Sequence, residues 1–260
     1  MIIDLFTWVT NGDIVSMGLL GGIIAALLNL AGATPVLFTR SYHKSFLNVG
    51  LGFAAGVMLA ASFTSLIFPG IEYGGVLPVM VGIVLGAFAI SLIDRLVPHL
   101  HFIKGREGPL SMRLKAIWLF VIAITIHNMP EGLTVGVGFG SGDIISGITL
   151  MFAIGFQNIP EGLSVGFSLI STGDYSRRRA FLVSMLSGFV EPPLAFLGAY
   201  LTHVFKQILP YFMGFAAGAM LFVVSDEIIP ETHREGKERI STYGLITGLI
   251  IMLLLDVLLH

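Results

Sequence analysis

The sequence contains no cysteine and few charged residues. The absence of cysteine excludes disulfide bonds and thiolate metal sites. Charged side chains make up 12% of the 260 residues, whereas a soluble domain carries about 25%, so most soluble enzymes and disordered proteins are excluded. The net charge of −2 and the pI near 6.4 argue against a nucleic-acid partner. With 55% hydrophobic residues and a mean hydropathy of +0.91, the composition predicts an integral membrane protein.

Long apolar segments fill most of the chain. A helix needs about 20 mostly apolar residues to cross a bilayer, and proline, glycine and charged residues divide the sequence into eight such segments. We predict membrane-spanning helices at about residues 13–33, 48–68, 77–98, 116–140, 145–170, 180–204, 208–230 and 242–259. The connections are short, so we expect an all-α integral membrane protein with one transmembrane domain over residues 1–260, surrounded by the lipid bilayer.

The positive charges are distributed unevenly between the two sides of this arrangement. The connections after predicted spans 1, 3, 5 and 7, with the adjoining helix ends, contain 13 of the 14 Lys and Arg residues, and the opposite side contains only Lys206. Cytoplasmic loops of membrane proteins are enriched in Lys and Arg. We therefore expect these four connections to be cytoplasmic and both termini to be extracytoplasmic, in a multi-pass protein of the cell (plasma or inner) membrane.

Two pairs of segments resemble each other. Gly52–Leu59 reads GFAAGVML and Gly214–Leu221 reads GFAAGAML, at an offset of 162, while NMPEGL at 128–133 returns as NIPEGL at 158–163. In the predicted topology both pairs run antiparallel, which predicts inverted repeats: spans 1–3 match spans 6–8, and span 4 matches span 5. A simpler interpretation of the first pair is close helix packing through small residues spaced four apart.

Several carboxylates lie inside the predicted spans. Glu131, Glu161 and Glu191 fall within spans 4, 5 and 6, and Asp226 and Glu227 lie toward the inner end of span 7. Each such carboxylate costs at least a few kcal/mol in the membrane unless it is compensated. No Lys or Arg lies at the depth of the first three, so either protonation or a bound divalent cation must neutralise them.

The residues near these glutamates in the sequence favour a bound divalent cation over protonation. At about 100° per residue, Glu131 lies within about 40° of His127 and about 60° from Asn128 on its other side, so its two oxygens can serve two ions. The next span repeats the pattern with Gln157, Asn158 and Glu161. Imidazole, carboxylate and amide ligands without thiolate suit Zn²⁺, Fe²⁺ or Mn²⁺ better than Cu⁺.

Prolines accompany the membrane carboxylates. Pro130 and Pro160 directly precede two of the glutamates, and each removes one helix hydrogen bond. The same association recurs at Pro192, Pro193 and Pro230. Broken helices at membrane depth are tolerated where they line a cavity, so we expect four kinked or broken helices around the site. Kinks that serve packing alone are the alternative.

These motifs resemble the ZIP (Zrt/Irt-like) family of divalent metal-ion transporters. The resemblance rests on HNMPEG at 127–132, QNIPEG at 157–162, Glu191-Pro192, and SDEIIPETH at 225–233. It extends over essentially the whole chain, and the short connections are similar to those of the prokaryotic GufA-like branch.

The resemblance implies a binuclear transport site at the membrane midplane. It places the first metal on His127, Glu131, Gln157 and Glu161. It places the second metal on Asn128, Asn158 and Glu191, with Glu131 and Glu161 bridging. Asn158 stands where related prokaryotic members often have Asp, and the lost negative charge leaves either a weaker second metal or a mononuclear site.

Further positions match the transport pathway of the family. Met58 aligns near the site, and Ser65 and Glu72 match an outer entrance. Asp226 and Glu227 fall where the family has metal-binding or exit-route side chains.

The resemblance implies a secondary carrier, not an enzyme, with no catalytic cofactor. It would bring divalent metal into the cytoplasm by alternating access, with Zn²⁺ the first candidate and Fe²⁺, Mn²⁺, Co²⁺ and Cd²⁺ also suited to the ligands. Spans 1, 4, 5 and 6 would slide, in an elevator-type motion, against a scaffold of spans 2, 3, 7 and 8. The family also implies a homodimer.

Two alternative functions would also explain carboxylates inside the membrane spans. A proton-coupled carrier for an organic solute could use them as a relay, although it would not need a duplicated His-Asn-Glu pattern. An intramembrane zinc hydrolase needs one open zinc held mainly by histidines. Only His127 lies near the middle of a span, and the sequence has no HExxH motif.

Overall fold

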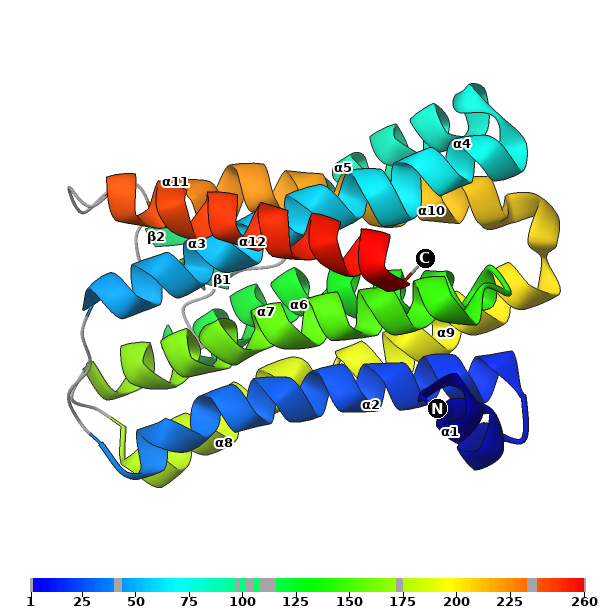
Figure 1. Ribbon diagram of the computed structural model, residues 1–260. Coiled ribbons are helices and arrows are strands. Elements are labelled where there is room, and N and C mark those ends of the chain that lie inside the picture. The colour runs from blue at the N-terminus through cyan, green and yellow to red at the C-terminus, as the bar shows by residue number, and fades with distance from the viewer. Residues whose placement is uncertain are drawn as a thin grey trace.

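The computed structural model describes residues 2–39, 44–96, 99–101, 105–107, 116–171, 175–232 and 238–259. Long helices run side by side and form a bundle (Figure 1). The first half contains α1 (Ile2–Thr10), α2 (Ile14–Ala33), η1 (Thr34–Leu37), α3 (Lys44–Ala61), η2 (Ser62–Ile67), α4 (Phe68–Gly74) and α5 (Val76–Leu96). The second half contains α6 (Ala116–Gly140), α7 (Ile144–Ser171), α8 (Arg177–Gly188), α9 (Glu191–Val204), η3 (Lys206–Ile208), α10 (Leu209–Val223), η4 (Val224–Ile228), α11 (Ile229–Thr232) and α12 (Glu238–Leu259).

One small sheet interrupts this helical architecture. β1 (His99–His101) and β2 (Gly105–Glu107) pair antiparallel, with His99 opposite Glu107. They lie in the connection between α5 and α6, for which no strand was predicted. The short helix α1 was not predicted either. The chain is otherwise helical over the described residues, as expected.

Polar side chains begin several of the long helices. Asp13 caps α2 by accepting a hydrogen bond from the Ser16 backbone N–H at 2.8 Å. At the start of α7, Asp143 Oδ1 accepts hydrogen bonds from the backbone N–H groups of Ile145 (3.0 Å) and Ser146 (3.3 Å). Such side chains satisfy the first N–H groups of a helix, which have no partner within it. Gly142, with φ of 91°, makes the tight turn that brings α7 back beside α6.

Six helical stretches among the described residues are long and apolar enough to cross a membrane. They span Ile14–Leu37, Leu47–Gly74, Val76–Leu96, Arg177–Val204, Lys206–Ile228 and Glu238–Leu258. The chain is therefore a multi-pass membrane protein. Helices α6 and α7 are not among the six, although their 25 and 28 residues exceed the length that about 30 Å of hydrocarbon requires. Both carry the polar residues of the predicted site.

Close glycine contacts join α3 to α12 and α5 to α10. A Cβ on Gly56 of α3 would overlap the Leu245 carbonyl oxygen of α12, and a Cβ on Gly86 of α5 would overlap that of Phe215 of α10. Equivalent contacts are made at Gly52, Gly82, Gly214, Gly218, Gly244 and Gly248. These eight glycines form four pairs at the offset of 162 found in the sequence, since 52, 56, 82 and 86 match 214, 218, 244 and 248. The repeated motif thus packs helix backbones together, and α3 packs on α12 as α10 packs on α5.

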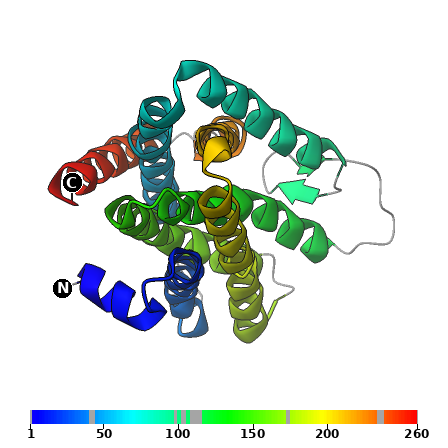
Figure 2. The same ribbon diagram turned by 90° about the vertical axis from the view of Figure 1, so that its right-hand side faces the viewer.

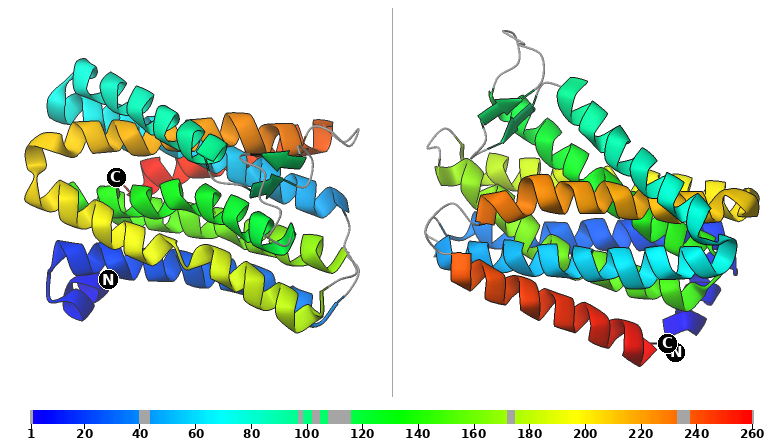
Figure 3. Two further views of the ribbon diagram at one scale, coloured as in Figure 1. Left: turned by 180° about the vertical axis from the view of Figure 1, so that it is seen from behind. Right: turned by 90° about the horizontal axis from the view of Figure 1, so that it is seen from above.

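A second set of glycines joins the remaining long helices to one another. Gly32 of α2 lies against the Ile159 backbone of α7, and Gly136 of α6 lies against the Ala195 backbone of α9. We call α2, α6, α7, α8 and α9 the first group, and α3, α4, α5, α10 and α12, with the short helical turns η2, η4 and α11, the second group. Figures 2 and 3 show the two groups as layers. Gly50 of α3 faces the other group, where an added Cβ would lie 2.6 Å from the Pro160 Cβ and 3.7 Å from the Pro160 Cα of α7.

Kinks or breaks were expected at four places, and the structure shows an interruption of the α-helix at two of them. The predicted sixth span is divided between α8 and α9, directly before Glu191 and the following prolines. In contrast, α6 and α7 continue as helices through Pro130 and Pro160, so neither helix is broken there, and the kinks expected at these prolines stay a prediction. A proline removes only one hydrogen bond of a helix, and both helices are tightly packed on either side. The π-helical turns η2 and η4 begin at Ser62 and Val224, again 162 residues apart, and η4 lies directly before Pro230.

The close backbone contacts at these glycines, which we call the backbone interlock, lead to a stability prediction. We expect Gly56→Ala to lower the thermal unfolding temperature of the detergent-solubilised protein by several degrees, because overpacking costs about 1–3 kcal/mol. The matched control is Gly70→Ala, whose Cβ would meet only side-chain atoms, the nearest at 3.0 Å. Equal unfolding temperatures for the two variants would contradict a backbone interlock.

Candidate metal centre

His127, Glu131 and Glu161 converge between α6 and α7. His127 and Glu131 lie one turn apart on α6, and Glu161 faces them from α7. One potential ligand atom from each residue lies within 4.8 Å of the other two, and His127 Nε2 is 3.7 Å from Glu161 Oε1. We call these three residues the His–Glu cluster. An imidazole with two carboxylates is a donor set that suits a divalent cation such as Zn²⁺.

Gln157 completes the set of residues predicted for the first metal. Its Nε2 donates a hydrogen bond of 2.7 Å to Glu131 Oε1. Gln157 and Glu131 are both fully buried, so this bond fixes the carboxylate between the two helices. The four side chains expected around the first metal therefore lie together.

A second set of polar residues lies where α6, α7 and α9 meet. Asn158 Nδ2 donates to both oxygens of Glu191, at 2.9 Å each. Asn128 Nδ2 donates to Glu191 Oε1 at 3.4 Å and to the Ser187 carbonyl oxygen at 3.1 Å. We call Asn128, Asn158 and Glu191 the amide–carboxylate cluster. All three side chains are buried, and the cluster ties the N-terminus of α9 to the centres of α6 and α7.

These two clusters and Gln157 contain buried oxygen atoms that accept no hydrogen bond. The atoms are Asn128 Oδ1, Glu131 Oε2, Gln157 Oε1, Asn158 Oδ1 and Glu161 Oε1. A buried acceptor without a donor costs about 1–3 kcal/mol, and more when it is charged. Three of them, on Glu131, Gln157 and Glu161, belong to the residues predicted for the first metal, and a cation would bind such oxygens favourably. The predicted metal ligands thus have the chemistry of a cation site.

Glu227 reaches the same centre from the second group. Glu227 Oε2 lies 3.7 Å from His127 Nδ1. Glu227 belongs to the π-helical turn η4. His127 therefore lies between Glu161 and Glu227, with one ring nitrogen toward each carboxylate. The neighbouring Asp226 is only half-buried. Met58, expected near the site, is fully buried in the main hydrophobic core.

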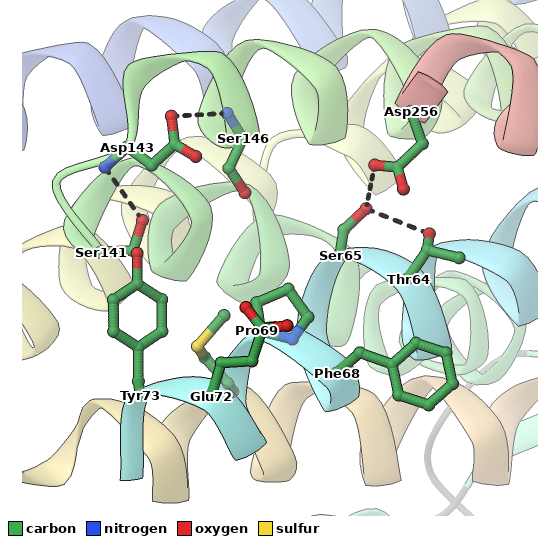
Figure 4. A pocket seen from close by; sticks show the side chains of 11 residues that line it. Thr64, Ser65, Phe68, Pro69, Glu72, Tyr73, Ser141, Asp143, Ser146 and Asp256 are labelled. Carbon is green, nitrogen blue, oxygen red and sulfur yellow. Dashed lines mark hydrogen bonds between the residues drawn. The ribbon is translucent and has the colours of Figure 1, made fainter. Parts of the chain in front are cut away.

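Ser65 and Glu72 line a cavity of about 480 Å³ (Figure 4). Asp143 and Asp256 also line this cavity. Ser65 Oγ donates a hydrogen bond of 3.4 Å to Asp256 Oδ1. It lies at the end of the bundle that carries the α6–α7 turn and both chain ends (Figure 1). Sequence reasoning missed the two aspartates, although Asp256 was detectable as a carboxylate inside the last apolar segment.

Comparison with known proteins identifies the family. The profile of the ZIP zinc transporter family matches residues 104–256. The chain is 41% identical to zinc transporter ZIPB of Bordetella bronchiseptica over 251 residues, which cover 93% of this chain and 81% of the relative. It is 38% identical to zinc transporter GufA of Myxococcus xanthus over 248 residues (92% and 97% covered). It is 36% identical to human zinc transporter ZIP11 over 332 residues (94% and 97% covered).

These relatives are named transporters and not enzymes. The His–Glu cluster, the membrane-spanning helices and the matched profile lead to one conclusion. The chain belongs to the ZIP family of zinc transporters, as its PEG motifs indicated.

Proposed function

We propose that this chain carries divalent metal ions, with Zn²⁺ first among them, across the membrane into the cytoplasm. The observation that carries the proposal is the His–Glu cluster, where buried carboxylates and an imidazole converge beside oxygens that lack hydrogen-bond donors. The printed names of the relatives support zinc as the substrate. Zn²⁺ accepts nitrogen and oxygen ligands of these types.

We propose eight membrane spans, with α6 and α7 added to the six apolar stretches, and both termini outside. The described cations support this sidedness: Arg95 ends α5, Arg177, Arg178 and Arg179 begin α8, and Arg239 begins α12. These helix ends share one end of the bundle, while Lys206 lies at the other (Figure 1). The cation-rich end is the cytoplasmic one under the positive-inside rule. From the resemblance we also propose a homodimer in the cell membrane.

We propose that alternating access is an elevator-type motion of the first group against the second. Within each group, glycines bring helix backbones into direct contact, so each group can move as a unit. Contacts between the groups include side-chain pairs, such as the bond from Thr134 Oγ1 to Met220 Sδ (3.0 Å) and the contact of His127 Nδ1 with Glu227 Oε2 (3.7 Å). Side chains exchange partners more readily than interlocked backbones. The offset of 162 supports the inverted repeats that make outward-open and inward-open states similar.

The cavity around Glu72 is the proposed outer entrance, and Glu227 with Asp226 the proposed exit. An entering cation would meet the carboxylates of Glu72, Asp143 and Asp256 first. It would then bind at the His–Glu cluster, and Glu227 lies on the far side of the His127 ring from Glu161. An inside-negative membrane potential favours entry by roughly 2.3 kcal/mol per charge per 100 mV.

The proposal predicts that the ligands are essential for transport. We expect His127→Ala and Glu161→Ala each to lower ⁶⁵Zn²⁺ uptake into proteoliposomes by at least about tenfold, because each removes one of few ligands. Glu238→Ala, an exposed glutamate at the start of α12, is the control and should transport normally. Uptake at the wild-type rate by the His127→Ala/Glu161→Ala double variant would contradict the proposed site.

The outer cavity predicts an effect on apparent affinity. We expect Glu72→Gln to raise the KM for Zn²⁺ several-fold at low ionic strength with little change in kcat, because a carboxylate at an entrance concentrates cations. Asp4→Asn removes an exposed charge at the same end of the bundle, outside the cavity. If both variants shift KM equally, the cavity is not the entrance.

The elevator motion predicts that a link between the groups stops transport. The chain has no cysteine, so Thr134→Cys/Met220→Cys can be joined by a short bis-methanethiosulfonate reagent without side reactions. We expect this cross-link to abolish Zn²⁺ uptake and a reducing agent to restore it. The single variants Thr134→Cys and Met220→Cys, treated with the same reagent, cannot form the link and should keep their uptake. Full transport by the cross-linked Thr134/Met220 pair would exclude the motion.

A further inference from the structure

The hydrogen bonds and charges around Glu191 bear on how many ions the centre holds. We infer that it binds a single divalent ion, at the His–Glu cluster with Gln157, and that the amide–carboxylate cluster is a lock that joins α6, α7 and α9 without a metal. The inference rests on the proposed function and specifies the ion stoichiometry of the same site.

The His–Glu cluster with Gln157 supplies a complete ligand set for one zinc ion. Protein zinc sites with four ligands are tetrahedral. One imidazole nitrogen of His127 and one oxygen each from Glu131, Glu161 and Gln157 make four. The three oxygens Glu131 Oε2, Glu161 Oε1 and Gln157 Oε1 are buried and accept no hydrogen bond, so no donor competes with a cation for them. A first ion therefore needs nothing from the amide–carboxylate cluster.

Hydrogen-bond donors hold Glu191 in the place where a metal would otherwise hold it. Both of its oxygens accept from Asn158 Nδ2 at 2.9 Å, and Oε1 also lies 3.4 Å from Asn128 Nδ2. The amide nitrogens thus face this carboxylate. The Asn128 amide is further fixed by its bond of 3.1 Å to the Ser187 carbonyl oxygen. A metal bound to Glu191 would have to displace these donors.

The charges at the site fit one ion only together with the amide donors. The buried site of the first group carries three carboxylates, Glu131, Glu161 and Glu191, and every described Lys and Arg side chain is at least partly exposed. One divalent ion leaves a net charge of −1 on this set and two leave +1, so the net charge alone does not separate the two cases. With one ion the remaining negative charge belongs to Glu191, whose oxygens accept hydrogen bonds from Asn158 and Asn128. A second ion at Glu191 would have to displace these donors, and the positive charge that it adds would have no compensating group in the set.

Glu227 approaches the same histidine from the second group. It contacts Nδ1 of His127, whereas Nε2 is the ring nitrogen near Glu161. It also belongs to the second group, so in the proposed motion it does not travel with the ion. An aspartate at position 158 would add a fourth carboxylate directly beside Glu191. The residue at 158 therefore sets the number of ions.

The test counts zinc ions bound to the full-length protein in detergent. Equilibrium dialysis against Zn²⁺, followed by mass-spectrometric metal analysis, gives ions per chain, and the His127→Ala/Glu161→Ala variant gives the background from surface histidines. We expect one ion above background for the wild type, two for Asn158→Asp and one for the neutral control Asn158→Ser. If Asn158→Asp does not fold, Asn128→Asp adds the same charge on the other side of Glu191 and should also bind two.

Different results would contradict different claims. Two ions above background in the wild type would overturn the inference while leaving the transport site in place. One ion in a folded Asn158→Asp or Asn128→Asp variant would also overturn it. If the His127→Ala/Glu161→Ala variant binds as many ions as the wild type, the proposed transport site itself is wrong, and the inference fails with it.

Discussion

The free-energy cost of burying carboxylates in an apolar helical bundle governs this structure. Glu131 and Glu191 are fully buried and Glu161 is 5% exposed. No described Lys or Arg side chain is buried, so positive side chains do not compensate them. Amide donors surround Glu191, while Glu131 and Glu161 have only one imidazole and one amide nearby and keep oxygens without donors. Such a site is stable with a bound cation and poorly satisfied without one.

Glycine packing determines where the buried carboxylates lie relative to the two helix groups. Close backbone contacts at glycines join the helices within each group, and His127 lies on the boundary between the groups, with Glu161 on one side and Glu227 on the other. A site at the boundary of two bodies becomes accessible from either side as they slide. The proposed ion ligands, however, all lie on α6 and α7, which move together in the proposed mechanism. The ion can therefore keep its ligands while its surroundings change.

The sequence predicted the features of the site that depend on the periodicity of a single helix and on the repeated motif. The period of 3.6 residues placed His127 and Glu131 on one face, and the duplicated motif placed Glu161 on the next helix. Contacts between distant segments were not accessible in this way. The approach of Glu227 to His127, the aspartates of the cavity, and the glycines at 82, 86, 244 and 248 depend on helix pairing across long sequence separations. The continuous helices through Pro130 and Pro160 show that surrounding packing can override a local helix breaker.

Anomalous X-ray scattering at the zinc absorption edge from crystals grown with Zn²⁺ tests the central claim most directly. The account predicts one strong peak between α6 and α7, about 2.0–2.2 Å from ligand atoms of His127, Glu131 and Glu161. A peak elsewhere in the bundle, or no peak at this centre in crystals of a transport-competent protein, would contradict it.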